Sequence, residues 1–471
     1  MNHGLLKAKL AVGALALAVA TLSHASATTL VVGGATLPAI GYVGTGAQTS
    51  TQVFPAGTGS LIAVYSAIRG NPTVSYCQTG SGAGKDILAG VTIAKSPGPG
   101  NNVYNVQYTC PSVANGNDTD NGFGADATGV GRSDLTTPSA AYADSPMASS
   151  DVTNYQSIHG SSAFPVEFPA VAGAIVVGMN MKTTDGVVLD HTNTSFTDAQ
   201  LCSIFSGAVT NWDDPTLASA FSLKSGDSIP STTIAVQYRS DGSGTSFSFT
   251  NHLTAVCPAN AAGDHFLTNQ TFTTAVSQFF TTLPASWTGS SGNPAVTKAI
   301  AATAGSIGYA EMANSLQAGI GFAKVNGIDP NTFPGTTASP TANTFALPTS
   351  SVVDNEVIQS NVYGTQGQPT LTTISGAPSN ECIELVDPNS YANLGGGIYP
   401  IFAVSYEVGN AAGNPSGDLS NIKSLLGAPF NSTITGSASL TQYGQGKGLA
   451  LLSTANTGVP TTTIISGCET D

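Results

Sequence analysis

A near-continuous apolar run, EFPAVAGAIVVGM at residues 167–179, is the feature that most limits what this chain can fold into. A strand with one solvated face alternates apolar and polar residues, whereas a strand that is buried on both faces is apolar along its length. Strands of the second kind lie in sheets whose two faces are covered by helices. The run therefore predicts a central strand of a sheet enclosed by helices.

Two earlier segments share one order of elements, a short β-rich strand followed by a glycine turn. TTLVVGGATLP predicts a strand at 29–32, and TVSYCQTGSGAGKDIL predicts a strand at 74–77, a turn at 80–84 and then a helix. SFTDAQLCSIFSG at 195–207 predicts a helix with Thr197 as its N-cap. Strands that alternate with helices favour an α/β, doubly wound fold with mostly parallel sheets, in which strand ends border a binding crevice.

Composition separates the rest of the chain into regular and irregular regions. Residues 95–130 contain KSPGPGNN and NGNDTDNGFGAD, which predict an elaborated surface loop. Residues 326–380 are rich in Pro, Thr, Ser and Asn with few large apolar residues, and we interpret them as a loop-rich insertion. GIYPIFAVSYEV predicts a strand at 397–408, and a last helix is expected near residue 420.

The first 27 residues have the pattern of a cleaved secretion signal. Two lysines precede an apolar stretch at 10–22, and ASA at 25–27 is the small-x-small pattern of a signal-peptidase site. The apolar stretch is shorter than the roughly 20 residues of a membrane-spanning helix. No cysteine for lipid attachment lies near the cleavage site. The sequence therefore predicts a signal peptide at 1–27 and a periplasmic or secreted protein without a lipid anchor.

The cysteines are expected to form disulfides, because this chain is bound for an oxidising compartment. The sequence alone leaves their pairing open. No CxxC pair is present and no cysteine stands at metal-ligand spacing from a histidine, so no metal site is predicted. The six cysteines are Cys77, Cys110, Cys202, Cys257, Cys382 and Cys468.

The charge balance excludes a nucleic-acid partner. The chain has 13 Lys+Arg against 27 Asp+Glu, a formal net charge of −14, so no basic stripe is available to neutralise a phosphate backbone. GSGAGK at 80–85 does not complete a nucleotide loop, since Thr79, Lys85 and Asp86 stand where the Walker and dinucleotide patterns need other residues. A glycine-rich turn with Ser81 at a helix start can still bind an anion, and a plain strand-to-helix turn is the alternative.

YRSDGSGTSFSFTNHL at 238–253 is the most informative polar segment. A guanidinium fork matches two oxygens of a tetrahedral oxyanion, and Asp241 can fix the rotamer of Arg239. The Gly, Ser and Thr residues at 242–245 stand at the start of a predicted helix, where hydroxyls and unpaired N–H groups converge. The segment predicts that Arg239 holds an oxyanion, phosphate in particular. An ordinary Arg–Asp pair on a surface loop is the alternative.

Four motifs, in this order, resemble the phosphate loops of the periplasmic phosphate-binding proteins of phosphate ABC importers and of their relatives, the DING proteins. They are GGATLP at 33–38, YCQTGSGAG at 76–84, GRSDLTTP at 131–138 and RSDGSGT at 239–245. The chain departs from the family in lacking the DING tetrapeptide at its mature start and in being longer than a typical importer protein. The resemblance implies a two-lobed, type II binding-protein fold with a hinge and an interlobe ligand cleft.

The resemblance also implies lobe boundaries and disulfides. Lobe I comprises 28–166 and 311–471, including the insertion at 326–380, and lobe II comprises 167–310. Cys202 and Cys257 are similar to a DING cysteine pair. Pairing of Cys382 with Cys468, and of Cys77 with Cys110, is left open.

Carried over residue by residue, the resemblance implies a set of phosphate contacts, with Asp241 bracing Arg239. Leu37 would act through its backbone N–H, and Asp126 is a rival to Asp134 because the insertion at 95–130 blurs the match. The implied contacts are Thr36, Leu37, Ser81, Asp134, Arg239, Ser243, Gly244 and Thr245.

The resemblance implies a monomeric phosphate carrier without cofactors that delivers inorganic phosphate to the membrane permease of an ABC importer. No motif of a metal or triad hydrolase is present, so no catalytic residue is predicted. Two alternatives remain open. One is a DING-type secreted alkaline phosphatase, and the other is a secreted adhesion or partner-binding protein.

Overall fold

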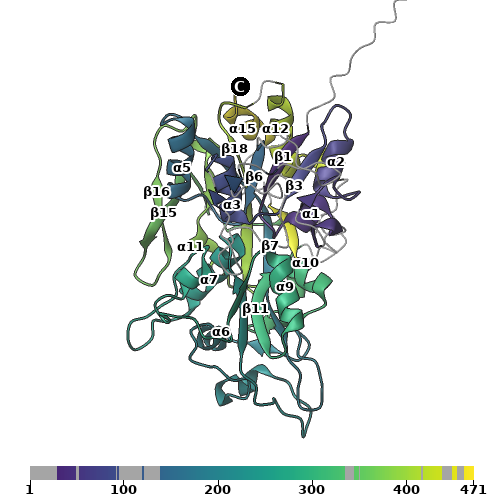
Figure 1. Cartoon of the computed structure of the whole chain (residues 1–471), viewed down its shortest axis with the longest axis vertical. Helices are drawn as coiled ribbons and strands as arrows, with labels where there is room; N and C mark the ends of the chain where they lie inside the picture. The colour runs from purple at the N-terminus through teal and green to yellow at the C-terminus, as the bar shows by residue number, and fades with distance from the viewer. Residues whose placement is uncertain are drawn as a thin grey trace, which may run out of the picture.

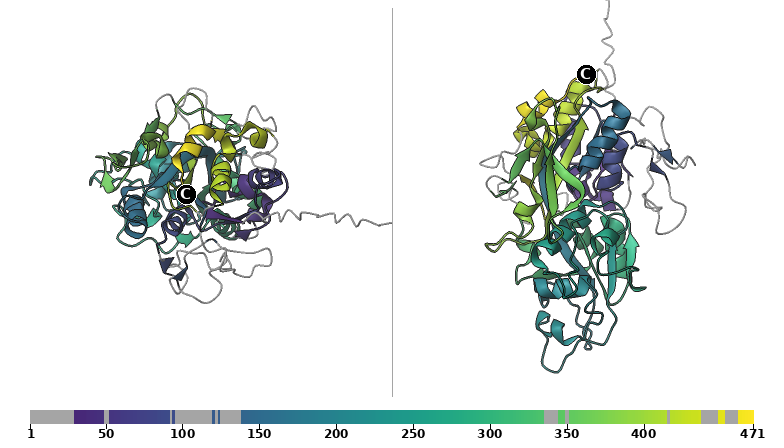
Figure 2. Two further views of the ribbon diagram at one scale, coloured as in Figure 1. Left: turned by 90° about the horizontal axis from the view of Figure 1, so that it is seen from above. Right: turned by 90° about the vertical axis from the view of Figure 1, so that its left-hand side faces the viewer.

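The computed structural model describes residues 29–48, 52–91, 93–94, 119–120, 123, 138–334, 344–348, 351–414, 417–436, 448–452 and 461–471. The expected signal peptide and most of the expected loop at 95–130 lie outside the described residues. Figure 1 shows an elongated body with two halves, and Figure 2 shows the same body from above and from the side. We call one the upper half, which contains both ends of the described chain and the strands β1, β3, β6 and β18. The other is the lower half, which contains the middle of the chain with β11, α6, α7 and α9.

The strands and helices of both halves have the following bounds. The strands are β1 Leu30–Gly34, β2 Gln52–Val53, β3 Val74–Cys77, β4 Ile93–Ala94, β5 Thr119–Asp120, β6 Ala140–Ala143, β7 Pro165–Asn180, β8 Ser195–Phe196, β9 Ala235–Arg239, β10 Thr288–Ser290, β11 Ser306–Glu311, β12 Gly321–Val325, β13 Thr344–Phe345, β14 Val352–Asp354, β15 Glu356–Tyr363, β16 Pro369–Thr373, β17 Glu384–Val386, β18 Phe402–Asn410 and β19 Leu449–Leu452. The helices are α1 Ala39–Val43, α2 Leu61–Ala67, α3 Ser81–Leu88, α5 Ser149–His159, α6 Asp198–Phe205, α7 Gly244–Val256, α8 Phe272–Ala275, α9 Asn293–Ala302, α10 Met312–Ala318, α11 Pro388–Tyr391, α12 Leu419–Leu426, α13 Ser432–Thr435 and α15 Thr462–Cys468.

Strand β7 runs through both halves. It is 16 residues long and buried except at Asn180, which confirms the strand predicted at 167–179. Its first part pairs antiparallel with β18, and its second part pairs antiparallel with β11. The pairing changes from β18 to β11 between Ala174 and Ile175. One continuous strand therefore contributes to the sheet of each half.

A mixed sheet of 13 strands passes through the described residues in the order β10-β9-β11-β7-β18-β6-β1-β3-β2, with the other strands branching from it. β1 is parallel to β3 and β6, and β9 is parallel to β10 and β11. The ladders of β7 are all antiparallel. The expectation of mostly parallel sheets is therefore wrong, because the chain leaves the upper half along β7 and its neighbours run back against it.

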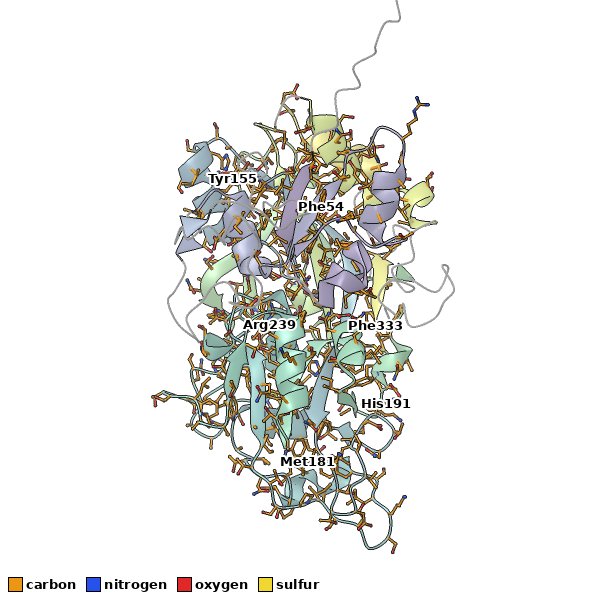
Figure 3. All side chains as sticks on the ribbon, turned by 45° about the vertical axis from the view of Figure 1, so that its right-hand side comes forward. Phe54, Tyr155, Met181, His191, Arg239 and Phe333 are labelled. Atoms are coloured by element: carbon orange, nitrogen blue, oxygen red, sulfur yellow. A yellow bond between two sulfur atoms is a disulfide. The ribbon has the colours of Figure 1, made fainter. Side chains whose placement is uncertain are left out.

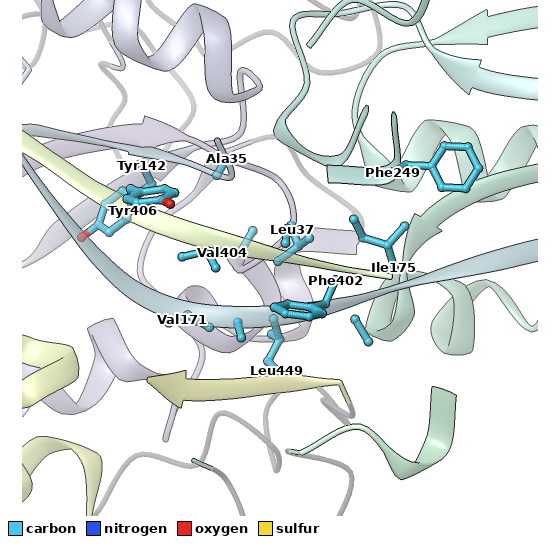
Figure 4. Close-up of a cluster of buried hydrophobic side chains, with 14 of the residues drawn as sticks. Ala35, Leu37, Tyr142, Val171, Ile175, Phe249, Phe402, Val404, Tyr406 and Leu449 are labelled. Carbon is cyan, nitrogen blue, oxygen red and sulfur yellow. The ribbon is translucent and has the colours of Figure 1, made fainter. Parts of the chain in front are cut away.

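The core of the upper half forms between β7, β18 and the loop that follows β1. Leu37, Val171 and Phe402 are buried side by side, as Figure 4 shows. A Cβ atom at Gly173 would lie 2.3 Å from Cδ2 of Leu37, so a larger residue would push this loop away from β7. The close approach fixes the position of the loop in which Thr36 and Leu37 lie.

Several local predictions are confirmed. Strands β1 and β3 lie at the predicted places, and α6 begins with a capping box in which Thr197 Oγ1 accepts from the Gln200 N–H at 3.3 Å. The turn predicted at 80–84 is wrong, because α3 begins at Ser81. Gly84 stands inside that helix, where its Cβ would lie only 2.6 Å from Cα of Gly34. The missing side chain at Gly84 therefore permits close packing of a helix on a strand, and this glycine does not mark a turn.

The interpretation of 326–380 as loops is wrong for its second part. Strands β15 and β16 pair as an antiparallel hairpin, and β14 pairs with β17. The hairpin is half exposed and rich in Thr and Val, residues that suit a strand without forming a long apolar run. The strand predicted at 397–408 begins at Phe402, and α12 is the helix expected near 420, but α15 follows it.

The hairpin also connects the two halves. Its base lies against α5 in the upper half, as Figure 1 shows. At its turn, Gly367 O accepts a hydrogen bond from the Thr268 N–H at 3.0 Å, and Tyr363 OH accepts from Asn269 Nδ2 at 2.7 Å. The insertion thus contacts the segment just before α8 in the lower half.

Two disulfides are described. Cys202–Cys257 joins α6 to the end of α7, which confirms the pair that the family resemblance implied, and Cys382–Cys468 closes α15 onto the upper half. Cys77 is also disulfide-bonded, whereas Cys110 lies outside the described residues.

The lobe boundaries at 166/167 and 310/311 remain predictions. None of the helices in the described ranges has both the length and the apolar character that crossing a membrane would need.

Several glutamates are buried in the core. Burial raises the pKa of Glu167 to about 8, against the opposing effect of nearby Lys85. Burial likewise raises the pKa of Glu469 to about 8 and that of Glu384 to about 9. The folded state therefore favours the neutral form of these groups more than the unfolded chain does, whose glutamates titrate near about 4.3.

We therefore expect the protein to lose stability as the pH rises from 5 to 8. A carboxyl with a raised folded-state pKa contributes its full stability below the unfolded pKa and loses it toward the folded pKa, at up to about 1.4 kcal/mol per pH unit for each proton. Urea unfolding at constant ionic strength measures this slope. Glu167→Gln, which keeps the acceptor for the Met147 N–H, should make the slope shallower, and the exposed Asp213→Asn should not. Equal or rising stability across this range would contradict the expectation.

Candidate functional site

Arg239 is the last residue of β9 and lies between the two halves, as Figure 3 shows. Its side chain is 1% exposed. Nε donates to Asp241 Oδ1 at 2.7 Å, and Nη2 donates to Asp241 Oδ2 at 2.5 Å, so one edge of the guanidinium is paired with both carboxylate oxygens. The pair is thus buried, unlike the surface ion pair considered as the alternative.

The other edge of the guanidinium faces hydroxyl groups. Nη1 donates to Thr36 Oγ1 and to Thr245 Oγ1, each at 3.2 Å. Thr36 follows β1 in the upper half, and Thr245 lies in the first turn of α7 in the lower half. Asn293, the first residue of α9, donates from Nδ2 to the same two hydroxyls at 3.1 and 3.2 Å. Segments far apart in the sequence therefore meet around one cation.

A second group of polar atoms involves Ser81 and Asp144. Ser81 Oγ accepts the Asp144 N–H at 2.9 Å and the Gly244 N–H at 3.3 Å, and it donates to Asp144 Oδ2 at 3.5 Å. Gly244 belongs to the lower half and approaches Asp144 very closely, since a Cβ at Gly244 would lie 2.3 Å from the Asp144 carbonyl carbon. Glycine at this position is what allows the halves to meet here.

Backbone groups add to the contact between the halves. The Gly82 N–H of the upper half donates to Gly242 O of the lower half at 2.9 Å. Within the lower half, the Gly292 N–H donates to Asp241 Oδ1 at 3.1 Å. A small cavity borders this region, lined by Thr36, Gln78, Thr79, Gly80, Ser291, Gly292 and Pro294.

Three helices begin at this site. α3 begins at Ser81, α7 at Gly244 and α9 at Asn293. The first N–H groups of a helix have no partner within the helix and carry the positive end of its dipole. Some of these N–H groups already donate to protein atoms, such as Gly82 to Gly242 O and Gly244 to Ser81 Oγ. The positive ends of the three helix dipoles and the Arg239 charge still create a positive potential, which suits an anion.

The site also holds one acidic side chain whose protonation is finely balanced. Burial raises the pKa of Asp144 to about 7, and the Ser405 hydroxyl, the Arg239 charge, the Leu37 backbone and the Ser81 hydroxyl oppose this rise. For Arg239 burial works against the charged form, but the Asp241 carboxylate outweighs it and raises the pKa of the guanidinium. Arg239 therefore stays charged, while Asp144 can be either a donor or an acceptor near neutral pH.

Most residues that the sequence predicted for the site are brought together. Arg239 contacts Thr36, Asp241 and Thr245 directly, and Ser81 contacts Gly244. Leu37 reaches the site through its backbone beside Asp144.

Ser243 lies next to these residues as the N-cap of α7. Its hydroxyl accepts the Ser246 N–H at 3.1 Å, and its own N–H donates to Gln270 O at 3.0 Å. It therefore fixes the start of the helix that carries Gly244 and Thr245.

The sequence reasoning named two acidic candidates that the structure does not describe, and two residues of the site were not predicted. Asp134 and its rival Asp126 both lie outside the described residues. Asp144 is the carboxylate described next to Ser81, and Asn293 is a second residue that the sequence reasoning missed. The signal for Asp144 was available, because it follows the short strand β6 as the other site residues follow β1 and β9.

The chain matches the family model described as a PBP superfamily domain over residues 42–417. Among curated proteins it is similar to alkaline phosphatase L of Pseudomonas aeruginosa, with 31% identity over 297 residues, 63% of this chain and 60% of that protein. It is also similar to the phosphate-binding protein PstS of Xylella fastidiosa, with 26% identity over 235 residues, 49% of this chain and 56% of that protein. The matched region thus spans about 60% of these relatives' own length or less.

Two solved structures have a similar fold. The phosphate-binding protein from Stenotrophomonas maltophilia matches with a TM-score of 0.55 and 21% identity, over 91% of each chain. A high-affinity periplasmic phosphate-binding protein, PfluDING, whose structure contains phosphate, matches with a TM-score of 0.54 and 18% identity, over 94% of this chain and 99% of that one. These matches confirm the predicted fold class, an α/β periplasmic binding-protein fold, although its sheet is mixed and not mostly parallel. The chain belongs to the PBP superfamily, as its resemblance to phosphate-binding and DING proteins predicted.

Proposed function

We propose that this protein binds inorganic phosphate between its two halves. The observation that supports this most strongly is the buried Arg239, whose Nη1 donates to hydroxyls from both halves while three helices begin beside it. Arg239 would supply the charge, and Thr36, Ser81 and Thr245 would supply hydroxyl donors. The names of its relatives, which include phosphate-binding proteins, agree with this proposal.

Asp144 would select for a protonated oxyanion. Hydrogen phosphate can donate its O–H to this carboxylate, whereas sulfate at neutral pH has no proton to donate and would face it with acceptors only. The carboxyl is buried, so water cannot relieve that repulsion. We propose that Asp144 takes the role that the sequence reasoning gave to Asp134.

The finer role that we propose is transport. Binding between two halves that contact each other would let phosphate stabilise a closed form by a hinge motion, and a membrane permease of an ABC importer would accept it. The disulfides Cys202–Cys257 and Cys382–Cys468 support a location outside the cytoplasm, in the periplasm or beyond, because such bonds persist in oxidising compartments. We propose that the carrier acts as a monomer.

A second candidate function is phosphate-ester hydrolysis. It is favoured by the similarity to alkaline phosphatase L and by Asp144, a buried carboxyl with a pKa of about 7 next to the Ser81 hydroxyl. Such a group can exchange a proton near neutral pH. A phosphatase should release p-nitrophenol from p-nitrophenyl phosphate once bound phosphate has been exchanged out, and the activity should disappear in Asp144→Asn. A preparation without turnover would leave binding as the function.

Arg239→Ala should abolish phosphate binding. The change removes the buried positive charge and its charge-assisted hydrogen bonds to Thr36 and Thr245, each worth about 1.5–3 kcal/mol. It also leaves Asp241 as an unpaired buried charge beside the anion. Isothermal calorimetry on the folded variant measures the loss, with the exposed Arg69→Ala as a control that should bind as wild type does. Unchanged affinity in a folded Arg239→Ala protein would refute the site.

Asp144→Asn should weaken the discrimination between phosphate and sulfate. Sites built around one buried hydrogen bond reject an analogue that lacks it by about 10⁴-fold, and the amide removes the charge while adding a donor that sulfate can use. Competition titrations on wild type and variant compare the two ions. If the variant rejects sulfate as strongly as wild type does, Asp144 is not the selecting residue.

A further inference from the structure

Asn293 contacts the site although it lies in none of the motifs that predicted it. It is fully buried at the start of α9. Its Oδ1 accepts the Glu311 N–H at 3.2 Å, which identifies the other end of the amide as the NH₂ group. That NH₂ group faces the hydroxyls of Thr36 and Thr245. The orientation of the amide is therefore set by the backbone of β11.

The two hydroxyls are surrounded by groups that can only donate. Thr36 Oγ1 faces Arg239 Nη1 at 3.2 Å, Asn293 Nδ2 at 3.1 Å and the Asn293 backbone N–H at 3.3 Å. Thr245 Oγ1 faces Arg239 Nη1 at 3.2 Å and Asn293 Nδ2 at 3.2 Å. A guanidinium and an amide NH₂ cannot accept a hydrogen bond.

A hydroxyl has two lone pairs and one proton. Two donors fill both lone pairs of Thr245 Oγ1, and three donors share the two lone pairs of Thr36 Oγ1. Each proton must then point away from Arg239 and Asn293. A hydroxyl proton that turned toward Arg239 Nη1 or Asn293 Nδ2 would meet no acceptor. Both threonines are thereby left as donors for whatever binds in front of them.

We propose that Asn293 is a specificity-determining, positioning residue, which with Arg239 holds Thr36 and Thr245 as obligatory donors. The inference rests on the proposed phosphate function. This arrangement of donors orients the ligand. Its unprotonated phosphoryl oxygens bind near Thr36 and Thr245, and its protonated oxygen binds near Asp144. The ligand class that fits is an oxyanion with at least two unprotonated oxygens and one O–H.

An aspartate at position 293 would have nearly the same shape but the opposite effect. It could still accept the Glu311 N–H through one oxygen, whereas its second oxygen would accept from the threonine hydroxyls and turn their protons away from the ligand. It would also place a negative charge beside the bound anion. Asn293→Asp therefore tests hydrogen-bond direction with little change in packing.

We expect Asn293→Asp to lower phosphate affinity by about 100-fold or more at pH 8 in calorimetry. The affinity ratio of variant to wild type should recover as the pH falls to 5, because the introduced carboxyl is protonated, loses its charge and regains a donor. Asn180→Ala is the matched control, since that amide contacts Ala301 O at the other end of α9 and should leave affinity unchanged. A ratio that stays constant with pH would overturn the inference.

A mutant cycle separates positioning from a general structural effect. Asn293→Ala should weaken binding about 10-fold in wild type but much less when Thr36 and Thr245 are both replaced by valine, because the amide acts through their hydroxyls. An equal loss in both backgrounds would overturn the inference. Wild-type protein that binds no phosphate would overturn the proposed function itself, whereas wild-type binding that Asn293→Asp leaves intact would overturn only the role of Asn293.

Discussion

The buried pair between Arg239 and Asp241 is the interaction on which the rest of the site depends. A guanidinium that is 1% exposed is tolerable only with a partner, and removing one member of such a pair typically destabilises a protein by about 3–5 kcal/mol. Asp241 occupies one edge of the guanidinium completely, so the other edge is directed at the hydroxyls of Thr36 and Thr245. In a chain with only 13 Lys+Arg, this cation is buried where three helices begin.

The fold brings this pair to the contact between the halves because β7 belongs to both of them. The loops after β1 and β6 arrive from one side, and the loop after β9 arrives from the other. Glycines permit the final approach, since Gly244 lies against the backbone of Asp144 and Gly82 donates to Gly242 O. The hairpin of β15 and β16 adds a contact between the halves away from the ligand site, at Gly367.

Neighbouring carboxyls divide into two electrostatic classes. Asp241 is paired with a cation, whereas Asp144 and Glu311 are buried with hydrogen-bonding neighbours, and burial raises the pKa of each to about 7. A neutral acid can donate as well as accept, and a paired carboxylate can only accept. The site and its surroundings therefore combine one permanent cation, donors from both halves and two acids that can change their protonation near neutral pH.

What the sequence by itself determined was local. Each feature that it determined depends on residues within one turn or one strand of each other. These features are the buried run at 167–179, the strand at 74–77, the N-cap Thr197 and the segment from Arg239 to Thr245. The motif RSDGSGT was sufficient to identify the cation, its brace and a helix start. The family resemblance added the fold and the Cys202–Cys257 pair.

Only the tertiary structure decided which distant groups join them. Asp144 contacts Ser81 across 63 positions, and Asn293 contacts Thr36 across 257. The place of Asp144 after a strand could mark it as a candidate, but neither residue's neighbours in the sequence specify these contacts. Strand direction around β7 and the hairpin within 326–380 likewise depend on pairing between distant segments. The physical reason is that a strand or a hydroxyl pairs with a group that only the folded chain brings close to it. The residues beside it in the sequence do not specify that partner.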